Sequence, residues 1–284
     1  MKSLVSLFAA CIVLYSCQKD TGNDPNPPLA AETRLNVAFG ADPLQKIDAY
    51  LPAGRTMAST KVIILIHGGG WNQGDKADFN TYVDTLKKRL PGYAIFNINY
   101  RLATGTANFF PAQENDVKAA VEFIYGKRGD YQISEKFVLL GASAGGHLSL
   151  LHAYKYTSPV KIKAVVDFFG PTDLVDMYNN PPNPLVPLLL MQVTGGNPTT
   201  HASLYQQSSP WNFVTAQTPP TIILQGGVDI VVSPSQSLLL KNKLQAMAVI
   251  HEYVFYPTEN HGWVGANLTD SFDKITAFLT ANVN

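Results

Sequence analysis

The sequence predicts an α/β protein with one mostly parallel sheet of about eight strands, helices on both faces and a small cap insertion. Short apolar runs alternate with segments whose apolar residues are spaced by three and four. Several runs, such as KVIILIH at 61–67 and KFVLLG at 136–141, are apolar at almost every position. Strands buried on both faces of a sheet have this composition, and their alternation with helices implies parallel crossover connections.

Each expected strand is a short run rich in β-branched and aromatic residues. In chain order the runs are RLNVAF, KIDAYL, KVIILIH, YAIFNINY, KFVLLG, KIKAVVDFFG, TIILQGG and IHEYVFY. Only residues 40–45 separate the first two runs, so we expect these to form a hairpin. Apolar spacing of three and four predicts helices over 78–90 and 115–128.

Residues 171–212 interrupt this alternation. This segment contains seven prolines, within and around the apolar stretch PLVPLLLMQV, and so many prolines are incompatible with one long helix. An insertion of this length in an open sheet often covers a ligand site. We favour a cap over the alternative, a plain surface excursion.

Composition indicates one folded unit from residue 33 to residue 284. Of the 284 residues, 46% are hydrophobic and 15% charged, which is enough apolar material for a large core. The net charge is zero, so the basic footprint of a nucleic-acid-binding protein is missing from the sequence. Cys/His clusters and cofactor-binding loops are missing from it as well. We therefore expect no metal, no cofactor and no nucleic-acid partner.

The first residues predict export. Lys2 precedes an apolar stretch of signal-peptide length, and the ending LYSC resembles a bacterial lipobox. We expect residues 1–16 to be a signal peptide, Cys17 to carry a lipid, and residues 17–32 to be a flexible polar tether. The protein would then contact a membrane only through this anchor, at the periplasm or the cell surface. The alternative is a cleaved signal with an incidental Cys17.

The segment GASAG at 141–145 points to a nucleophile. It places Ser143 between glycines at the end of an expected strand and the start of an expected helix. A serine on such a sharp turn has strained backbone, and small neighbours allow the turn to close. The turn exposes the hydroxyl of Ser143 and directs the N–H of Ala144 towards the same space.

A serine nucleophile needs a base and an acid, which follow it along the chain in sites of this type. His261 lies in the loop after the last expected strand and is our candidate for the base, because His251 lies inside that strand. Asp229 follows the strand TIILQGG. We favour it as the acid over Asp173, whose short side chain more often caps a turn or a helix.

The segment HGGGW at 67–71 supplies candidate donors for an oxyanion. Glycines allow backbone N–H groups to approach a ligand closely. We expect Gly69 and Gly70, together with Ala144, to form an oxyanion hole, with the Trp71 N–H as a substitute for one glycine. His67 is expected to stabilise this turn. A phosphate-binding loop is the competing interpretation, but the lysine and hydroxyl of a P-loop are missing.

Taken together, these segments resemble the α/β-hydrolase superfamily, and more narrowly the BD-FAE-like and hormone-sensitive-lipase-like carboxylesterases. The resemblance runs from about residue 33 to the C-terminus. The matching segments are IDAYLP, HGGGW, INYRL, FPAQENDVKAAVEFI, GASAGG, FFGPTDL, SPWNFV, ILQGGVDIVVSPSQS and the final HGW. Many relatives have HG where this chain has Gln225-Gly226, a departure that keeps the glycine turn.

The resemblance implies that Ser143, Asp229 and His261 are nucleophile, acid and base. It also implies that Tyr100, Arg101 and Asp116 support the fold. The expected activity is hydrolysis of carboxylic esters through an acyl-enzyme, on small-molecule esters or on acetyl or feruloyl esters of polysaccharide. The alternatives are an amide or formamide hydrolase, and a non-catalytic ligand-binding lipoprotein on the same scaffold. Five aromatic residues are candidates for lining the pocket: Trp71, Phe109, Phe110, Trp211 and Trp263.

Overall fold

The computed structural model describes residues 27–284, in which eight strands form one sheet in the order β1-β2-β4-β3-β5-β6-β7-β8. The pairs β1–β2 and β2–β4 are antiparallel and all other pairs are parallel. The expected mostly parallel sheet and its opening hairpin are therefore confirmed. The strands are β1 (Glu32–Ala38), β2 (Lys46–Leu51), β3 (Lys61–Ile66), β4 (Tyr93–Ile98), β5 (Phe137–Ala142), β6 (Ala164–Phe168), β7 (Thr221–Gly226) and β8 (His251–Tyr256).

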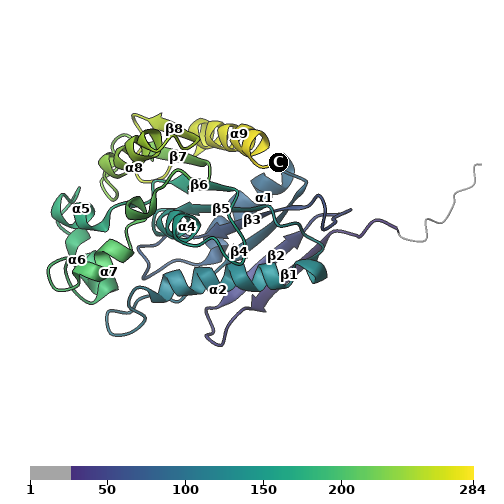
Figure 1. The fold of residues 1–284 in the computed structure, drawn as a ribbon, viewed down its shortest axis with the longest axis horizontal. Helices are drawn as coiled ribbons and strands as arrows, with labels where there is room; N and C mark the ends of the chain where they lie inside the picture. Colours follow the sequence, from purple (N-terminus) through teal and green to yellow (C-terminus); the bar gives the residue numbers. More distant parts are fainter. Residues whose placement is uncertain (1–26) are drawn as a thin grey trace, which may run out of the picture.

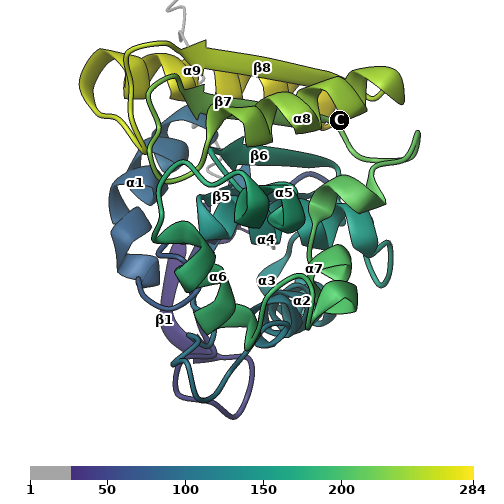
Figure 2. The same ribbon diagram turned by 90° about the vertical axis from the view of Figure 1, so that its left-hand side faces the viewer.

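Helices cover both faces of the sheet (Figures 1 and 2). Apolar side chains of α1 (Asn80–Arg89) and α9 (Gly265–Asn282) form one core layer with one face. Those of α2 (Ala112–Gly126), α4 (Ala144–Lys155) and α8 (Pro234–Ala246) pack on the other. Two short elements flank these helices: η1 (Lys76–Phe79) leads into α1, and α3 (Arg128–Tyr131) follows α2.

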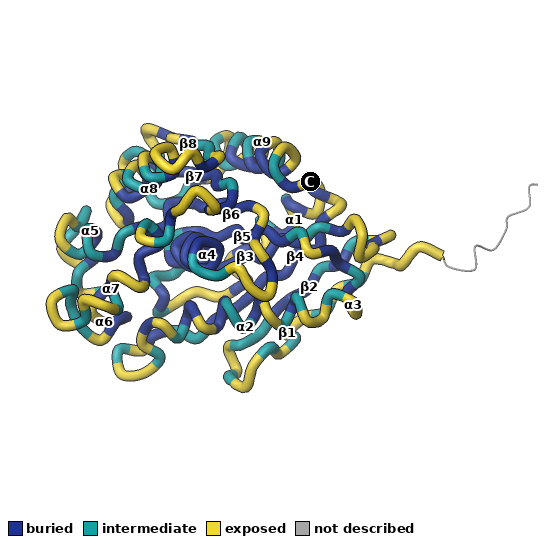
Figure 3. The backbone as a smooth tube through the Cα atoms, viewed as in Figure 1, coloured by how far each residue is buried: buried dark blue, intermediate teal, exposed yellow. Residues whose placement is uncertain are grey.

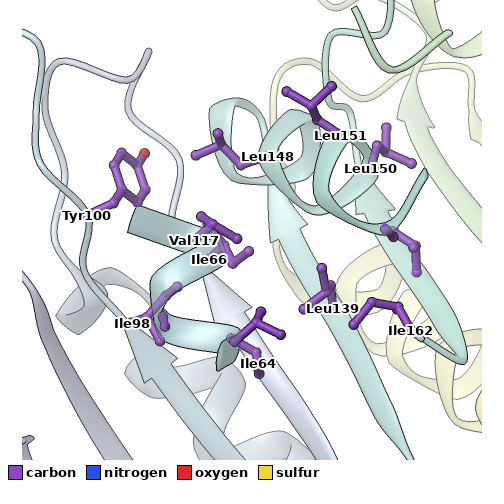
Figure 4. Packing of buried hydrophobic residues seen from close by; sticks show 14 of the residues in the cluster. Ile64, Ile66, Ile98, Tyr100, Val117, Leu139, Leu148, Leu150, Leu151 and Ile162 are labelled. Atoms are coloured by element: carbon purple, nitrogen blue, oxygen red, sulfur yellow. The ribbon is translucent and has the colours of Figure 1, made fainter. Parts of the chain in front are cut away.

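The core is built from the central strands and α4. Every residue of β4, β5, β6 and β7 is buried, which accounts for the predominance of apolar residues along these strands. Figure 4 shows residues of this cluster on both layers: Leu148, Leu150 and Leu151 on α4, and Ile64, Ile66 and Leu139 on the strands. Burying each such side chain contributes about 1.5–3 kcal/mol relative to leaving it exposed.

Helix α4 is buried along almost its whole length, as the dark trace in Figure 3 shows. Residues 144–154 are all buried, so the helix lacks the polar stripe of a surface helix. Because α4 directly follows Ser143, the nucleophile candidate is attached to one of the most constrained segments of the molecule.

The insertion between β6 and β7 forms a cluster of short helices at one end of the molecule, facing the viewer in Figure 2. It contains α5 (Leu174–Asn179), α6 (Val186–Thr194), α7 (Ala202–Gln207) and the turn η2 (Pro210–Phe213). Pro187 lies in the first turn of α6, where its missing N–H costs nothing. Gly195 ends the same helix at φ +79°. The expectation that residues 171–212 do not form one long helix is therefore correct.

Contacts between the N-terminal segment and the domain begin before the expected boundary at Thr33. The carbonyl of Leu29 accepts a hydrogen bond of 2.8 Å from the Gly54 N–H, and the carbonyl of Ala30 accepts one from Arg55. Strand β1 itself starts at Glu32. The expected signal peptide, Cys17 and residues 17–26 of the expected tether lie outside the described residues. No helix within residues 27–284 combines the length and apolar character that a membrane crossing requires.

Candidate active site

Ser143 lies on the turn between β5 and α4 with φ +55° and ψ −123°, a conformation that residues other than glycine rarely adopt. The glycines on either side are sterically required. A Cβ on Gly141 would lie 2.1 Å from the Gly145 carbonyl oxygen, and a Cβ on Gly145 would lie 1.9 Å from that of Ile66. The Ser143 N–H donates to the Phe168 carbonyl at 2.8 Å, which ties the turn to β6.

The structure brings Ser143, His261 and Asp229 together from three different loops. The Nε2 atom of His261 lies 2.9 Å from the Ser143 Oγ, and its Nδ1 lies 2.8 Å from the Asp229 Oδ2. Because a carboxylate only accepts, Nδ1 carries the proton and Nε2 is left to accept from the serine hydroxyl. The Asp229 side chain is fully buried and that of His261 is 19% exposed, so the imidazole alone borders solvent.

The backbone holds the carboxylate of Asp229 in place. Its Oδ1 accepts hydrogen bonds from the N–H groups of Val231 and Val232, at 2.8 and 2.9 Å. The N–H of His261 donates to the side chain of Asn260 at 2.8 Å, which orders the loop after β8. Both loops start at the carboxyl ends of neighbouring parallel strands, and this explains why residues 32 positions apart meet.

The loop after β3 carries the glycines expected to form an oxyanion hole. Gly69 and Gly70 have φ of +102° and +56°, and Trp71 has φ +60°. Within residues 27–284, the N–H groups of Gly69, Gly70, Trp71 and Ala144 donate to no protein acceptor. Ala144 is the first residue of α4, where N–H groups lack acceptors inside the helix. The loop and Ser143 line the same cavity, so these donors are available beside the hydroxyl.

Two buried histidines fix this loop. His147 accepts from the Trp71 indole N–H through Nδ1 at 3.1 Å and donates through Nε2 to the Ser208 carbonyl at 2.7 Å. Burial lowers the pKa of His147 to about 4, so the ring is neutral at pH 7 and can accept from Trp71. Burial also lowers the pKa of His67, whose ring stacks on Tyr100 at 4.3 Å. His67 therefore supports the turn, as expected.

The residues expected to support the fold do so around this loop. The hydroxyl of Tyr100 donates to the His67 carbonyl at 3.0 Å and to that of Gly68 at 3.2 Å. Arg101 forms an ion pair of 2.7 Å with the buried carboxylate of Asp116. Together these contacts anchor the segment after β4 beneath the glycine loop.

The rejected candidates have structural roles. Asp173 caps α5, where its carboxylate accepts from the N–H groups of Val175 and Asp176 at 2.9 and 3.1 Å. His251 lies in β8, and its Nδ1 contacts the Val249 carbonyl. Neither side chain contacts Ser143.

A cavity of about 570 Å³ opens over Ser143 and His261. Four residues of the insertion line it, namely Pro171, Met177, Val186 and Leu189, so the insertion covers the site as expected of a cap. A Cβ on Gly70 would lie 3.2 Å from a Leu189 methyl group, which places α6 directly against the glycine loop.

The expected aromatic lining is largely wrong. Of the five candidates only Trp71 borders the cavity. Phe110 packs against His147, Trp263 packs against Phe168 in the core, and Lys243 lies over the Trp211 ring. Phe109 packs near Gly195 at the end of α6. Sequence reasoning missed Phe79 and Phe169, which do line the cavity; Phe169 could have been found because it directly follows β6.

The family model BD-FAE matches residues 47–244, which is more than half of the sequence. The chain belongs to the BD-FAE family. The match spans the glycine loop, Ser143 and Asp229 and ends before His261. The fold and the family expected from the sequence are therefore confirmed.

Curated relatives of this BD-FAE protein include esterases and peptidases. It is 26% identical to esterase LipC of Mycobacterium tuberculosis, over 87% of this chain and 64% of that protein. It is 27% identical to dipeptidyl aminopeptidase BIII of Pseudoxanthomonas mexicana, over 78% of this chain and 33% of that enzyme. The chain thus spans less than two thirds of the length of either relative.

Among solved structures, a truncated carbohydrate esterase from gut microbiota superimposes with a TM-score of 0.75 and 26% identity. That match covers 89% of this chain and 96% of the other. A bifunctional GH43-CE protein of Bacteroides eggerthii also gives a TM-score of 0.75, at 27% identity, over 86% of this chain and 38% of its own. Within residues 27–284, no group of three or more His, Cys, Asp or Glu side chains is placed to hold a metal ion.

Proposed function

We propose that this BD-FAE protein is a serine hydrolase that cleaves carboxylic esters through an acyl-enzyme. The observation that carries the proposal is the hydrogen-bonded series from Ser143 through His261 to Asp229 at the floor of a cavity. Gly70 lines the same cavity and Ala144 directly follows Ser143, and within the described residues the backbone N–H groups of both donate to no protein acceptor, which is the combination that acyl transfer requires.

The mechanism follows from the donors and acceptors in place. His261 removes the proton of Ser143 through Nε2 as Oγ attacks the ester carbonyl carbon. The carbonyl oxygen becomes an oxyanion that the Gly69 or Gly70 and Ala144 N–H groups stabilise, and the alcohol leaves with the proton from His261. Water then repeats the sequence on the acyl-enzyme and releases the acid. Asp229 holds the imidazole tautomer and stabilises the imidazolium in both steps.

Esters of polysaccharide are the proposed substrates, with acetyl or feruloyl as the acyl group. The support is the similarity to two solved proteins described as carbohydrate esterases, both above 25% identity. A cavity of about 570 Å³ can hold a small acyl group and one sugar residue.

The first experiment is hydrolysis of a substrate panel by the purified protein and by Ser143→Ala. The panel contains p-nitrophenyl acetate, butyrate and octanoate, methyl ferulate, acetylated xylan, N-formylkynurenine and a dipeptide p-nitroanilide. We expect ester turnover by the wild type that Ser143→Ala lowers by several orders of magnitude, as loss of the nucleophile does in serine proteases. Ser59→Ala, at an exposed serine, is the matched control and should keep full activity.

The panel also separates the competing functions. The similarity to dipeptidyl aminopeptidase BIII favours amide hydrolysis as the second candidate, and turnover of only the amide substrates would establish it. Labelling of Ser143 by a fluorophosphonate reports an activated serine even when no panel member is cleaved. If the protein shows neither labelling by the fluorophosphonate nor turnover of any panel member, it is a ligand-binding protein. That result would reject both hydrolase functions.

We also propose that the protein is exported and anchored by a lipid on Cys17. The support is the basic Lys2, the apolar stretch that follows it and the lipobox-like ending LYSC. We expect the full chain to fractionate with membranes and Cys17→Ala to be released. Mass spectrometry of the membrane fraction identifies the N-terminus. An unmodified N-terminus that begins after Cys17 would contradict the lipid anchor.

A further inference from the structure

We propose that Gln225 is a positioning residue that fixes the carboxylate of Asp229, an inference that rests on the proposed function. Gln225 lies at the end of β7, four residues before the acid, and its side chain is fully buried. Its Nε2 donates to the Asp229 Oδ2 at 3.2 Å and to the Gly226 carbonyl at 3.0 Å. Its Oε1 accepts from the Ser237 hydroxyl at 2.7 Å.

These contacts fix which end of the amide faces the acid. A flipped amide would direct its oxygen at a carboxylate oxygen and at a carbonyl oxygen, both of which only accept. The orientation with Nε2 towards Asp229 satisfies every partner. The side-chain amide of Gln225 therefore donates a specific hydrogen bond to Asp229 and does more than fill space in the core.

Gln225 is one of the hydrogen-bond donors that fix the orientation of the Asp229 carboxylate. The Oδ1 atom of Asp229 is held by the N–H groups of Val231 and Val232. The Oδ2 atom accepts from His261 and, within the described residues, from one other side chain, Gln225. Without that amide, Oδ2 is oriented by His261 alone, so the acid no longer directs the imidazole independently.

The same amide ties the acid loop to two neighbouring segments. Ser237 lies in α8, which begins directly after the acid loop, so its bond to Oε1 couples the helix to the end of β7. A Cβ on Gly226 would lie 2.2 Å from the Asn260 carbonyl oxygen, so the strand end also contacts the loop that carries His261. Gln225 thus lies where the loops of the acid and of the base meet.

The test compares Gln225→Met with Gln113→Met. Gln113 is also fully buried, and it donates one hydrogen bond of 2.8 Å to the Asn108 carbonyl, so its loss is a matched structural change elsewhere in the fold. We expect Gln225→Met to lower kcat on p-nitrophenyl acetate about 10- to 100-fold, the effect of losing a hydrogen bond to a charged group, with KM changed less than about twofold. Gln113→Met should keep kcat within about twofold.

A double-mutant cycle separates positioning from general destabilisation. With Asp229→Ala as the background, Gln225→Met should cause no further loss of kcat, because the carboxylate that it orients is gone. An equal loss in both backgrounds would overturn the inference, and so would wild-type kcat in Gln225→Met or a comparable loss in Gln113→Met.

Gln225→Glu keeps the shape of the side chain and serves if Gln225→Met fails to fold. It places a second carboxyl group against Asp229, and two carboxyl groups in contact raise the pKa of one of them. We expect its kcat relative to the wild type to rise as pH falls from 8 to 6, because a protonated carboxyl restores a donor. A ratio that does not change with pH would contradict the inference. If wild-type Ser143 neither reacts with a fluorophosphonate nor cleaves any ester, the proposed function fails and this inference with it. An active wild type with an unaffected Gln225→Met rejects this inference alone.

Discussion

Acidification should destabilise this protein through His147, and the size of the effect can be worked out. Burial lowers the pKa of His147 to about 4, whereas an unfolded chain keeps it at about 6.5. Between these values the unfolded chain binds a proton that the folded chain does not, so the free energy of unfolding falls as pH falls. The difference between the two pKa values corresponds to about 3 kcal/mol of unfolding free energy in total. About 2 kcal/mol of this is lost between pH 7 and pH 5.

His152 provides the matched control. It lies on the same helix, and burial lowers its pKa to about 4 as well. Its ring packs near Tyr156, away from the glycine loop, whereas His147 accepts the indole N–H of Trp71. Between pH 7 and pH 5 the free energy of unfolding should fall by about 2 kcal/mol less in His147→Gln than in the wild type, and the same is expected of His152→Gln. Only His147→Gln should also lower ester turnover, because it disturbs the loop of the oxyanion donors.

Urea unfolding followed by tryptophan fluorescence at pH 7, 6 and 5 measures this quantity. The comparison is the change in the free energy of unfolding with pH, in the wild type and in each variant, so contributions from other groups cancel. If His147→Gln loses as much stability on acidification as the wild type does, His147 is not a buried neutral imidazole. The contact between Trp71 and His147 would then be wrong as described.

Three further predictions test other parts of the argument. Asp173→Ala removes the cap of α5 and should lower the free energy of unfolding in urea by about 1 kcal/mol, with kcat on p-nitrophenyl acetate unchanged. A large loss of kcat would reopen the choice between Asp173 and Asp229 as the acid. Lys76→Met leaves the buried carboxylate of Asp48 without its ion pair of 2.7 Å and should lower the free energy of unfolding by about 3–5 kcal/mol, measured in the same way. Ser143→Gly and Ser143→Ala should both be inactive. The glycine variant should be more stable than the alanine variant by about 1 kcal/mol, because glycine alone adopts φ +55° without strain. Equal melting curves of the two variants would argue against strain at this turn.

The positions of the strands along the chain could be predicted from the sequence, most clearly for the central strands β3 to β7, because these are buried at nearly every residue and are mostly apolar. It was less informative for α4, whose residues are buried on all sides and so show no helical periodicity. That helix was inferred from the glycines around Ser143. The turn chemistry therefore compensated for the missing hydrophobic pattern.

The partners of Ser143 could be predicted because chemistry and position at strand ends restrict the choice. His261 and Asp229 each follow a strand whose carboxyl end reaches the same edge of the sheet. The aromatic lining could not be predicted, since a buried aromatic in the core and one at a cavity have the same sequence signature. The donation from Gln225 to Asp229 depends on a side-chain rotamer, and at the sequence level Gln225 appeared only as a departure from similar sequences.

Three residues with strained backbone border the cavity at Ser143. Trp71, Ser143 and Phe169 all have positive φ, of 60°, 55° and 43°, and each follows a parallel strand of the central sheet. Such conformations cost about 1–3 kcal/mol each, so the three together are comparable to the net stability of a typical domain. They persist because neighbouring strands hold them: the N–H of Ser143 donates to the Phe168 carbonyl, and that of Phe169 to the Leu224 carbonyl, both at 2.8 Å. All three residues line the cavity. The buried sheet and α4 therefore offset the cost of the three strained residues that border this cavity.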